Sequence, residues 1–212
     1  MITVTAFKWV PPFARGLVRD LRVRWALEEA GIPYKTRLIG PDDQASPEYR
    51  ALQPFGQVPV LEENGLALFE SGSILLHVGE RSETLLPKDP AGRARAITWV
   101  FAALNSIETV VQPLVGIDLF YEGQEWAKLR RPEAEAAVKR RLSELAESLG
   151  TKEYLDDRFT AGDLMMTTVL RLLRHTPLVK AEPRIAAFQE RCEKRPAFQR
   201  ALEGQMTDLG VS

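Results

Sequence analysis

The first part of the chain alternates short apolar runs with one mixed apolar and charged run. Residues 2–7 are rich in Val, Ile and Thr and alternate in polarity, which predicts a strand. Residues 19–30 place apolar side chains among Arg and Glu, which predicts a helix, and Gly31 follows where helices favour glycine. Residues 34–39 predict a second strand. Strand, helix and strand in this order predict a right-handed parallel unit.

Two further apolar runs, 58–61 and 66–69, predict a β-hairpin. They are joined through Asn-Gly at 64–65, the favoured dipeptide of a two-residue turn because both positions tolerate positive φ. The polar pair Glu70-Ser71 follows, directly before an apolar pattern with helical spacing. The strand, turn, strand and helix complete a β-α-β, β-β-α arrangement, which is a thioredoxin-like layout.

The hairpin carries groups that can contact a ligand. Pro59 cannot donate to a ladder, so we place it at the mouth of its strand, where a cis bond would leave the N–H and C=O of Val58 for an extended ligand. Ser71 can cap the helix that follows, and the N–H groups at a helix start attract a carboxylate. Glu70 beside it can hold an ammonium group. Together these groups suit a small zwitterionic peptide.

From residue 91 onward the strand patterns stop and helical periodicity takes over. Apolar residues recur at steps of three and four, which predicts a long helix that Pro113 kinks. A second helix is predicted over 138–149, with Pro132 just before it and Gly150 just after it. This half is therefore expected to be entirely helical.

A third helix, over 164–173, is apolar nearly all round and is expected to lie in the centre of the helical half. Thr160 can cap its start, and Asp163 three residues later can reach back, which is a variant of the capping box. Two shorter helices are predicted over 184–194 and 196–205.

Composition excludes several function classes. The chain has 28 Lys and Arg against 29 Asp and Glu, so nothing indicates a nucleic-acid partner. A single cysteine, Cys192, excludes a disulfide within one chain and is typical of a reducing compartment. The chain has two histidines and this one cysteine, too few nitrogen and sulfur ligands for a zinc site, so we expect no metal site. The N-terminus lacks signal-peptide features, and no uncharged apolar stretch is expected to approach membrane-spanning length. We therefore expect a cytoplasmic protein with no membrane partner.

At the hairpin the chain resembles the glutathione transferase family. In that family the residue before a cis-proline pairs with the cysteinyl backbone of glutathione, and an acidic residue followed by Ser holds the γ-glutamyl end. The resemblance implies the first role for Val58, preceding Pro59, and the second for Glu70 and Ser71. It also places Gln57 beside the tripeptide. Glutathione is then the expected co-substrate.

The capping pattern at Thr160 resembles the N-capping box of the family's C-terminal domain, so the resemblance covers nearly the whole chain. It implies a thioredoxin-like α/β domain over 1–84 followed by an all-α helical bundle over 91–212. The linker between them contains prolines 87 and 90. The resemblance further implies a homodimer and a small apolar electrophile as the second substrate. A cleft for that electrophile is expected to include Trp99, Phe101, Phe120 and Tyr121.

The group that activates the sulfur of glutathione is missing from its usual place. Most family members use a Tyr, Ser or Cys just after the first strand, because a thiol with an ordinary pKa of about 8.5 needs a hydrogen bond to its anion. Here residues 8–23 contain no Ser, Thr, Tyr, Cys or His. Two alignments with the family pattern place Pro11 or Leu17 at that position, and neither side chain can donate. Their disagreement indicates an insertion around Gly16.

An electrostatic substitute is available in this segment. Arg15 lies near the start of the first helix, where the dipole and the N–H groups favour an anion. We predict that Arg15 stabilises the thiolate, with Arg19 or the indole N–H of Trp9 as the second choices. The expected activity is attack of the glutathione sulfur on the electrophile. The alternatives are a glutathione-dependent isomerase, whose relatives keep a serine near the first helix, and a non-catalytic module that binds glutathione or a protein.

Overall fold

A computed structural model describes residues 1–211 of the chain. These residues form two compact units. One unit contains Met1–Pro87 together with the residues from Arg195 onward, and the other contains Lys88–Lys194. The first unit is α/β and the second is all-helical, as the sequence predicts.

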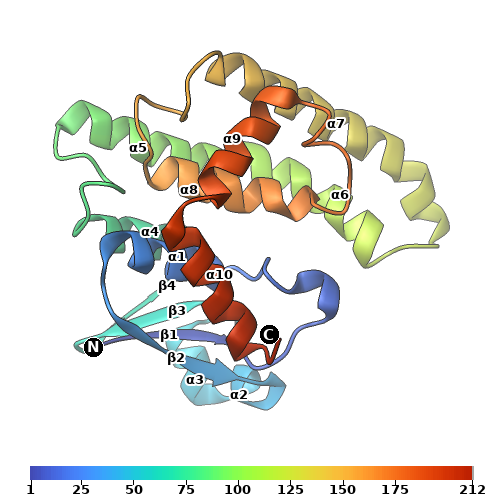
Figure 1. Cartoon of the computed structure of the whole chain (residues 1–212). Helices are drawn as coiled ribbons and strands as arrows, with labels where there is room; N and C mark the ends of the chain where they lie inside the picture. Colours follow the sequence, from blue (N-terminus) through green and yellow to red (C-terminus); the bar gives the residue numbers. More distant parts are fainter. Residues whose placement is uncertain (212) are drawn as a thin grey trace. The chain divides into compact units, whose positions relative to one another are not determined.

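The first unit contains a mixed four-stranded sheet (Figure 1). The strand order is β2 (Tyr34–Ile39), β1 (Ile2–Phe7), β3 (Val60–Glu63) and β4 (Leu66–Phe69). β1 and β2 run parallel, whereas β3 is antiparallel to β1 and to β4. The strands predicted over 2–7 and 34–39 are confirmed. The β3–β4 hairpin turns at Asn64 and Gly65, whose φ angles of 49° and 82° are both positive as the turn requires.

Helices cover both faces of this sheet, and their bounds are α1 (Asp20–Ala30), α2 (Pro41–Ala45), α3 (Pro47–Leu52) and α4 (Ser71–Gly79). In Figure 1, α1 and α4 lie on one face and α2 and α3 on the other. Gly31, with φ 65°, ends α1 as predicted. The short helices α2 and α3 were not predicted, and both begin with a proline at their first position. Tyr49 of α3 is buried against Val58 and Val60.

The helix α10 (Pro196–Asp208) packs on α1 within the first unit. The rings of Trp25 and Phe198 meet edge to face with centroids 4.8 Å apart, and both side chains are fully buried. The domain boundaries predicted along the sequence, 1–84 and 91–212, therefore divide the chain differently from its packing. The difference lies in α10. This helix follows the helical unit in the sequence, but it packs on α1 and so belongs to the core of the first unit.

The second unit consists of helices, and their bounds are α5 (Pro90–Ala102), η2 (Ala103–Glu108), α6 (Thr109–Leu119), α7 (Glu125–Leu149), α8 (Ala161–Leu170), η3 (Arg171–Leu173) and α9 (Pro183–Glu193). Every residue of α8 is buried, which confirms the central helix. The capping box at its start is also confirmed. Thr160 N–H donates to the Asp163 carboxylate over 2.8 Å, and Gly162 N–H donates to the Thr160 hydroxyl over 3.2 Å.

The two prolines singled out in this unit both lie inside helices. Pro132 was expected to precede a helix, but it lies inside α7, which begins at Glu125. Pro132 is exposed, so water can replace the hydrogen bond that its ring removes. Pro113 lies within α6, and the helical run departs from α geometry in the π-helical segment η2, which precedes α6.

The combined run α5–η2–α6, Pro90–Leu119, is long and apolar enough to cross a membrane by length and composition. The expectation concerned uncharged stretches, and this run is interrupted by Glu108 near its middle. Helical runs in the core of a folded unit pass the same test. Here α5 and η2 both pack on the buried helix α8.

Candidate functional site

The loop that enters β3 is held in place from α3. The Val58–Pro59 peptide bond is cis. Tyr49 donates its hydroxyl to the main-chain oxygen of Gln57 over 2.6 Å, and burial raises the pKa of Tyr49 to about 12. Val58 lies outside β3, so its main-chain N–H and C=O are not part of the strand ladder. The loop therefore presents main-chain groups from a fixed position.

Gly56, at the base of this loop, has a backbone conformation that other residues rarely adopt, and a side chain there would displace the Arg50 guanidinium. Its φ is 63°, and a Cβ built there would lie 2.6 Å from the Arg50 guanidinium carbon. Arg50 in turn donates to the main-chain oxygen of Pro54 over 3.0 Å. Sequence reasoning found neither Tyr49 nor Arg50, because both act through the packing of α3, which the pattern did not predict.

The start of α4 contains the predicted polar pair. Glu70 is the N-cap residue and has φ 68° and ψ 112°, a conformation that is strained for any residue but glycine. The Glu70 side chain makes no capping hydrogen bond, and the N–H groups of the first turn have no partner within the helix because they stand at its start. Glu70 is exposed, whereas Ser71 is buried. The helix start therefore offers main-chain donors beside an exposed carboxylate.

Ser71 does not cap α4, contrary to the prediction. Because Glu70 occupies the N-cap position, Ser71 is the first helical residue, and its hydroxyl accepts a hydrogen bond from the Arg22 guanidinium over 3.1 Å. Arg22 is only 3% exposed. In the sequence, only the apolar neighbours of Arg22 within the predicted helix indicate that it is buried. A buried arginine needs a polar partner, but the sequence does not say which one.

The segment between β1 and α1 contains the three candidates for thiolate stabilisation. A short 3-10 turn, η1 (Pro12–Ala14), is followed by Arg15, which is half-buried. Arg19, the N-cap residue of α1, is exposed, and Trp9 is 69% exposed. The three candidates thus lie on one connecting segment, and nothing in their placement selects among them.

The first turn of α1 already contains an anion, which sequence reasoning missed. Asp20 is 1% exposed and accepts a hydrogen bond from Arg24 over 2.7 Å. Burial raises the pKa of Asp20, and the charge of Arg24 opposes that rise. The positive end of the α1 dipole therefore already interacts with the Asp20 carboxylate, and a bound anion would compete for the same interaction.

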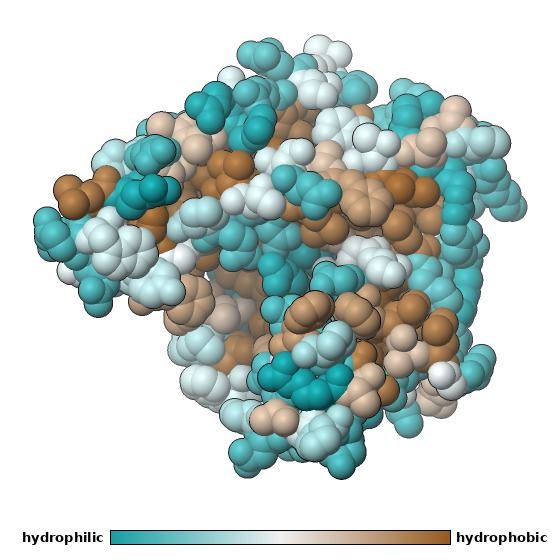
Figure 2. Space-filling view, turned by 180° about the vertical axis from the view of Figure 1, so that it is seen from behind, coloured by the Kyte–Doolittle hydropathy of each residue, from teal (hydrophilic) through white to brown (hydrophobic). Residues whose placement is uncertain are grey.

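The aromatic residues expected in the electrophile cleft lie on the helical unit. Phe101, Phe120 and Tyr121 are exposed, and Trp99 is half-buried. Tyr121 and Trp126, with ring centroids 5.0 Å apart, line a largely apolar cavity of about 490 Å³. Figure 2 shows hydrophobic side chains reaching the surface in several patches among hydrophilic ones. Trp126 was not predicted because it stands at the start of a helix that the sequence placed later.

Comparison with known proteins decides the family. A family model for the N-terminal domain of glutathione S-transferases matches residues 21–81. Glutathione S-transferase 4 of Zea mays is 30% identical over 202 residues, which cover 90% of each chain. The chain belongs to the glutathione transferase family. A further relative of this glutathione transferase-family protein, GstA of Escherichia coli O157:H7, is 28% identical over 177 residues, covering 81% of this chain and 82% of the relative.

Solved structures of glutathione transferases have the same fold. A protein from Burkholderia graminis, with two glutathione molecules bound per subunit, is 27% identical with a TM-score of 0.82, covering 95% of this chain and 87% of its own. A theta-class enzyme from Xanthomonas axonopodis pv. citri, with glutathione bound, is 26% identical with a TM-score of 0.80, covering 95% and 96%. The predicted fold class, a thioredoxin-like domain followed by a helical one, is confirmed.

Proposed function

We propose that this protein binds glutathione and joins its sulfur to a small apolar electrophile. The observation that supports this most is the arrangement at the first unit: a held loop at Val58–Pro59 and the uncapped start of α4 at Glu70. The family supports it as well, because relatives have been solved with glutathione bound. No metal is needed for this chemistry.

The cysteinyl and γ-glutamyl parts of the tripeptide each have proposed partners. The N–H and C=O of Val58, beside Pro59, pair with the cysteinyl main chain of glutathione, and Gln57 lies next to them. The first-turn N–H groups of α4 and the Ser71 hydroxyl receive the γ-glutamyl carboxylate, because helix N-termini stabilise anions. Glu70, which is exposed, pairs with the ammonium group. The proposed site thus gives the ammonium group an opposite charge and gives the γ-glutamyl carboxylate a set of hydrogen-bond donors.

Stabilisation of the thiolate is proposed to be electrostatic. Arg15 is the first choice, and Arg19 and Trp9 follow it. A guanidinium near the sulfur lowers the pKa of the thiol without any hydroxyl, since an opposite charge favours the ionised form. The electrophile is proposed to bind on exposed aromatic residues of the helical unit such as Phe120 and Tyr121.

Binding and turnover are tested separately. The protein is passed over immobilised glutathione, eluted with free glutathione and assayed for conjugation with a generic chloro-nitroaromatic compound. Retention with turnover is the expected result. Failure to bind at all would contradict every glutathione-based function.

A second function, a non-catalytic glutathione-binding module, is favoured by one observation. Residues 8–23 contain no side chain with a hydroxyl, thiol or imidazole group. Retention on the column without turnover would support this module. For the transferase we further propose a homodimer in the cytoplasm, with detoxification as its role; sedimentation of the purified protein tests the dimer.

A further inference from the structure

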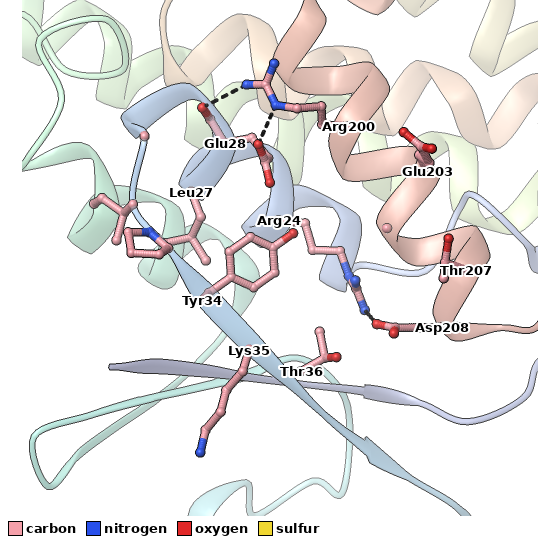
Figure 3. A pocket seen from close by; sticks show the side chains of 14 residues that line it. Arg24, Leu27, Glu28, Tyr34, Lys35, Thr36, Arg200, Glu203, Thr207 and Asp208 are labelled. Carbon is pink, nitrogen blue, oxygen red and sulfur yellow. Dashed lines mark hydrogen bonds and ion pairs between the residues drawn. The ribbon is translucent and has the colours of Figure 1, made fainter.

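The helix α10 meets α1 through two sets of polar contacts. Toward the C-terminal end of α1, Arg195 pairs with Glu29 over 2.6 Å and Arg200 pairs with Glu28 over 2.7 Å. Figure 3 shows the Arg200–Glu28 pair at one end of a groove between the two helices. Arg200 is about half exposed, so this pair contributes little to stability.

The second set lies toward the start of α1 and is buried. Arg24 donates to Asp20 over 2.7 Å and to Asp208 of α10 over 2.6 Å. In Figure 3 the Arg24 side chain points along the groove toward Asp208, with the Tyr34 ring beside it. The side chains of Arg24 and Asp20 are both 2% exposed, and that of Asp208 is 24% exposed. A charge buried to this degree is costly without its partner, so α10 is needed to hold Arg24.

Gln205 of α10 extends this network to the segment that precedes α1. Its side-chain amide nitrogen donates to the main-chain oxygen of Val18 over 3.2 Å and to Asp20 over 2.8 Å. Gln205 is 2% exposed. One amide group thus holds the turn before the helix and the first residue of the helix together. Without it, the buried Asp20 carboxylate and the main-chain oxygen of half-buried Val18 would each lose a donor.

The other side of α1 holds the proposed glutathione site. Arg22, two residues after Asp20, donates to the Ser71 hydroxyl over 3.1 Å. Helix α1 therefore contacts α10 through Asp20 and Arg24, and it contacts α4 through Arg22. Val18, which Gln205 holds, lies between the candidate residues Arg15 and Arg19.

We propose that Gln205, together with Asp208, is a positioning residue for glutathione binding. It fixes the start of α1, and through α1 it fixes the Arg22–Ser71 contact and the Arg15–Arg19 segment. This inference rests on the proposed glutathione site. It adds to that site α10, a helix that contributes none of the residues proposed to contact glutathione.

The test compares Gln205→Leu with a matched control on the same pair of helices. Gln205→Leu keeps the side-chain size and removes the donor, and Arg200→Met removes the exposed pair with Glu28. We expect glutathione to bind about 10-fold more weakly to Gln205→Leu, which corresponds to about 1.4 kcal/mol, and within about 2-fold of the wild type to Arg200→Met. The KM for glutathione should rise while the KM for the electrophile stays constant. A loss of stability alone would not raise the KM for glutathione while leaving the KM for the electrophile unchanged.

A double-mutant cycle separates positioning from general damage. If Gln205 acts through Ser71, the fold-changes of Gln205→Leu and Ser71→Ala should combine to less than their product. Asp208→Asn provides a milder variant, which should weaken glutathione binding in the same direction. The positioning role would be overturned if the fold-changes of Gln205→Leu and Ser71→Ala multiply in the double variant. It would also be overturned if Gln205→Leu and Asp208→Asn bind glutathione with wild-type affinity. Failure of the wild-type protein to bind glutathione would instead overturn the proposed function.

Discussion

Single residues of the proposed site depend on partners far away in the sequence. Ser71 is identified by its neighbour Glu70 and by the helix that follows, but its hydroxyl is bonded to Arg22, 49 residues earlier. The main-chain oxygen of Gln57 is bonded to Tyr49, which is only eight residues earlier but belongs to another element, α3. Local patterns therefore indicate which residues form the site, whereas tertiary contacts decide what each side chain does.

The role of Ser71 predicts a loss of glutathione affinity on substitution. Ser71→Ala removes the buried hydroxyl and leaves the Arg22 donor without that acceptor. We expect the dissociation constant for glutathione to rise by about 10-fold, measured by titration calorimetry. Ser73→Ala, an exposed serine of the same helix, is the matched control and should bind as the wild type does. Equal binding by both variants would exclude Ser71 from the site.

The electrostatic hypothesis predicts a change in the pKa of bound glutathione. Arg15→Ala removes a positive charge near the sulfur, so the thiol pKa should rise by about one unit. Titration of the thiolate absorbance of the complex measures it. The same titration on Arg19→Ala and Trp9→Phe identifies the stabilising group if Arg15 is not the one. An unchanged pKa in Arg15→Ala would remove Arg15 from the mechanism.

At the scale of elements, helix α8 shows how cap and packing act together. The Asp163 carboxylate accepts main-chain hydrogen bonds from Leu155 and Thr160, each of 2.8 Å, at a site that excludes water. Burial raises the pKa of Asp163 to about 6, and these hydrogen bonds limit the rise. The cap was predictable from Thr160 and Asp163 alone. Its contact with Leu155 was not, because that residue lies outside the capping pattern.

The raised pKa of Asp163 predicts a pH-dependent stability. The ordinary value is 3.8, so the folded state holds the proton more tightly than the unfolded chain. This contribution is fully present below about pH 4 and is lost as the pH rises through about 6, amounting to roughly 3 kcal/mol or less. Urea unfolding between pH 4 and 7 should show the decrease, and Asp163→Asn should remove it. Glu147→Gln, an exposed carboxylate on α7, should not alter the slope.

Close approach of α8 to α5 predicts that replacing Gly162 destabilises the protein. A Cβ built on Gly162 would lie 2.4 Å from the Cβ of Trp99. We expect Gly162→Ala to lower the free energy of unfolding by about 2 kcal/mol. Gly116 in α6 is the control, because a Cβ there would meet only Tyr121 at 3.9 Å. Gly116→Ala should stabilise by up to about 1 kcal/mol, as alanine does inside a helix.

At the scale of the whole molecule, the last helix belongs to the first unit. Phe198 of α10 packs edge to face on Trp25 of α1, and the buried network around Arg24 includes Asp208. Sequence order predicted a helical domain that continues to residue 212, because the periodicity of 196–205 resembles that of the helices before it. An apolar helical face does not specify which core it joins.

Removal of α10 should therefore damage the first unit selectively. Truncation after Lys194 exposes Trp25 and leaves Arg24 without Asp208. We expect faster amide hydrogen exchange in α1 and the sheet, with protection retained in α8, because each unit has its own core. Exchange that rises first in α8 would show that the last helix stabilises the helical unit instead.

The sequence by itself determined the strands, the hairpin, the central buried helix and its cap, because each depends on local periodicity or on neighbouring residues. It also indicated the Glu70-Ser71 pair and the missing hydroxyl in 8–23. The tertiary structure alone decided the partner of Ser71, the anion at the start of α1 and the core that α10 joins. These depend on contacts such as Arg22–Ser71 and Gln205–Val18, whose residues are distant in the chain and carry no local pattern.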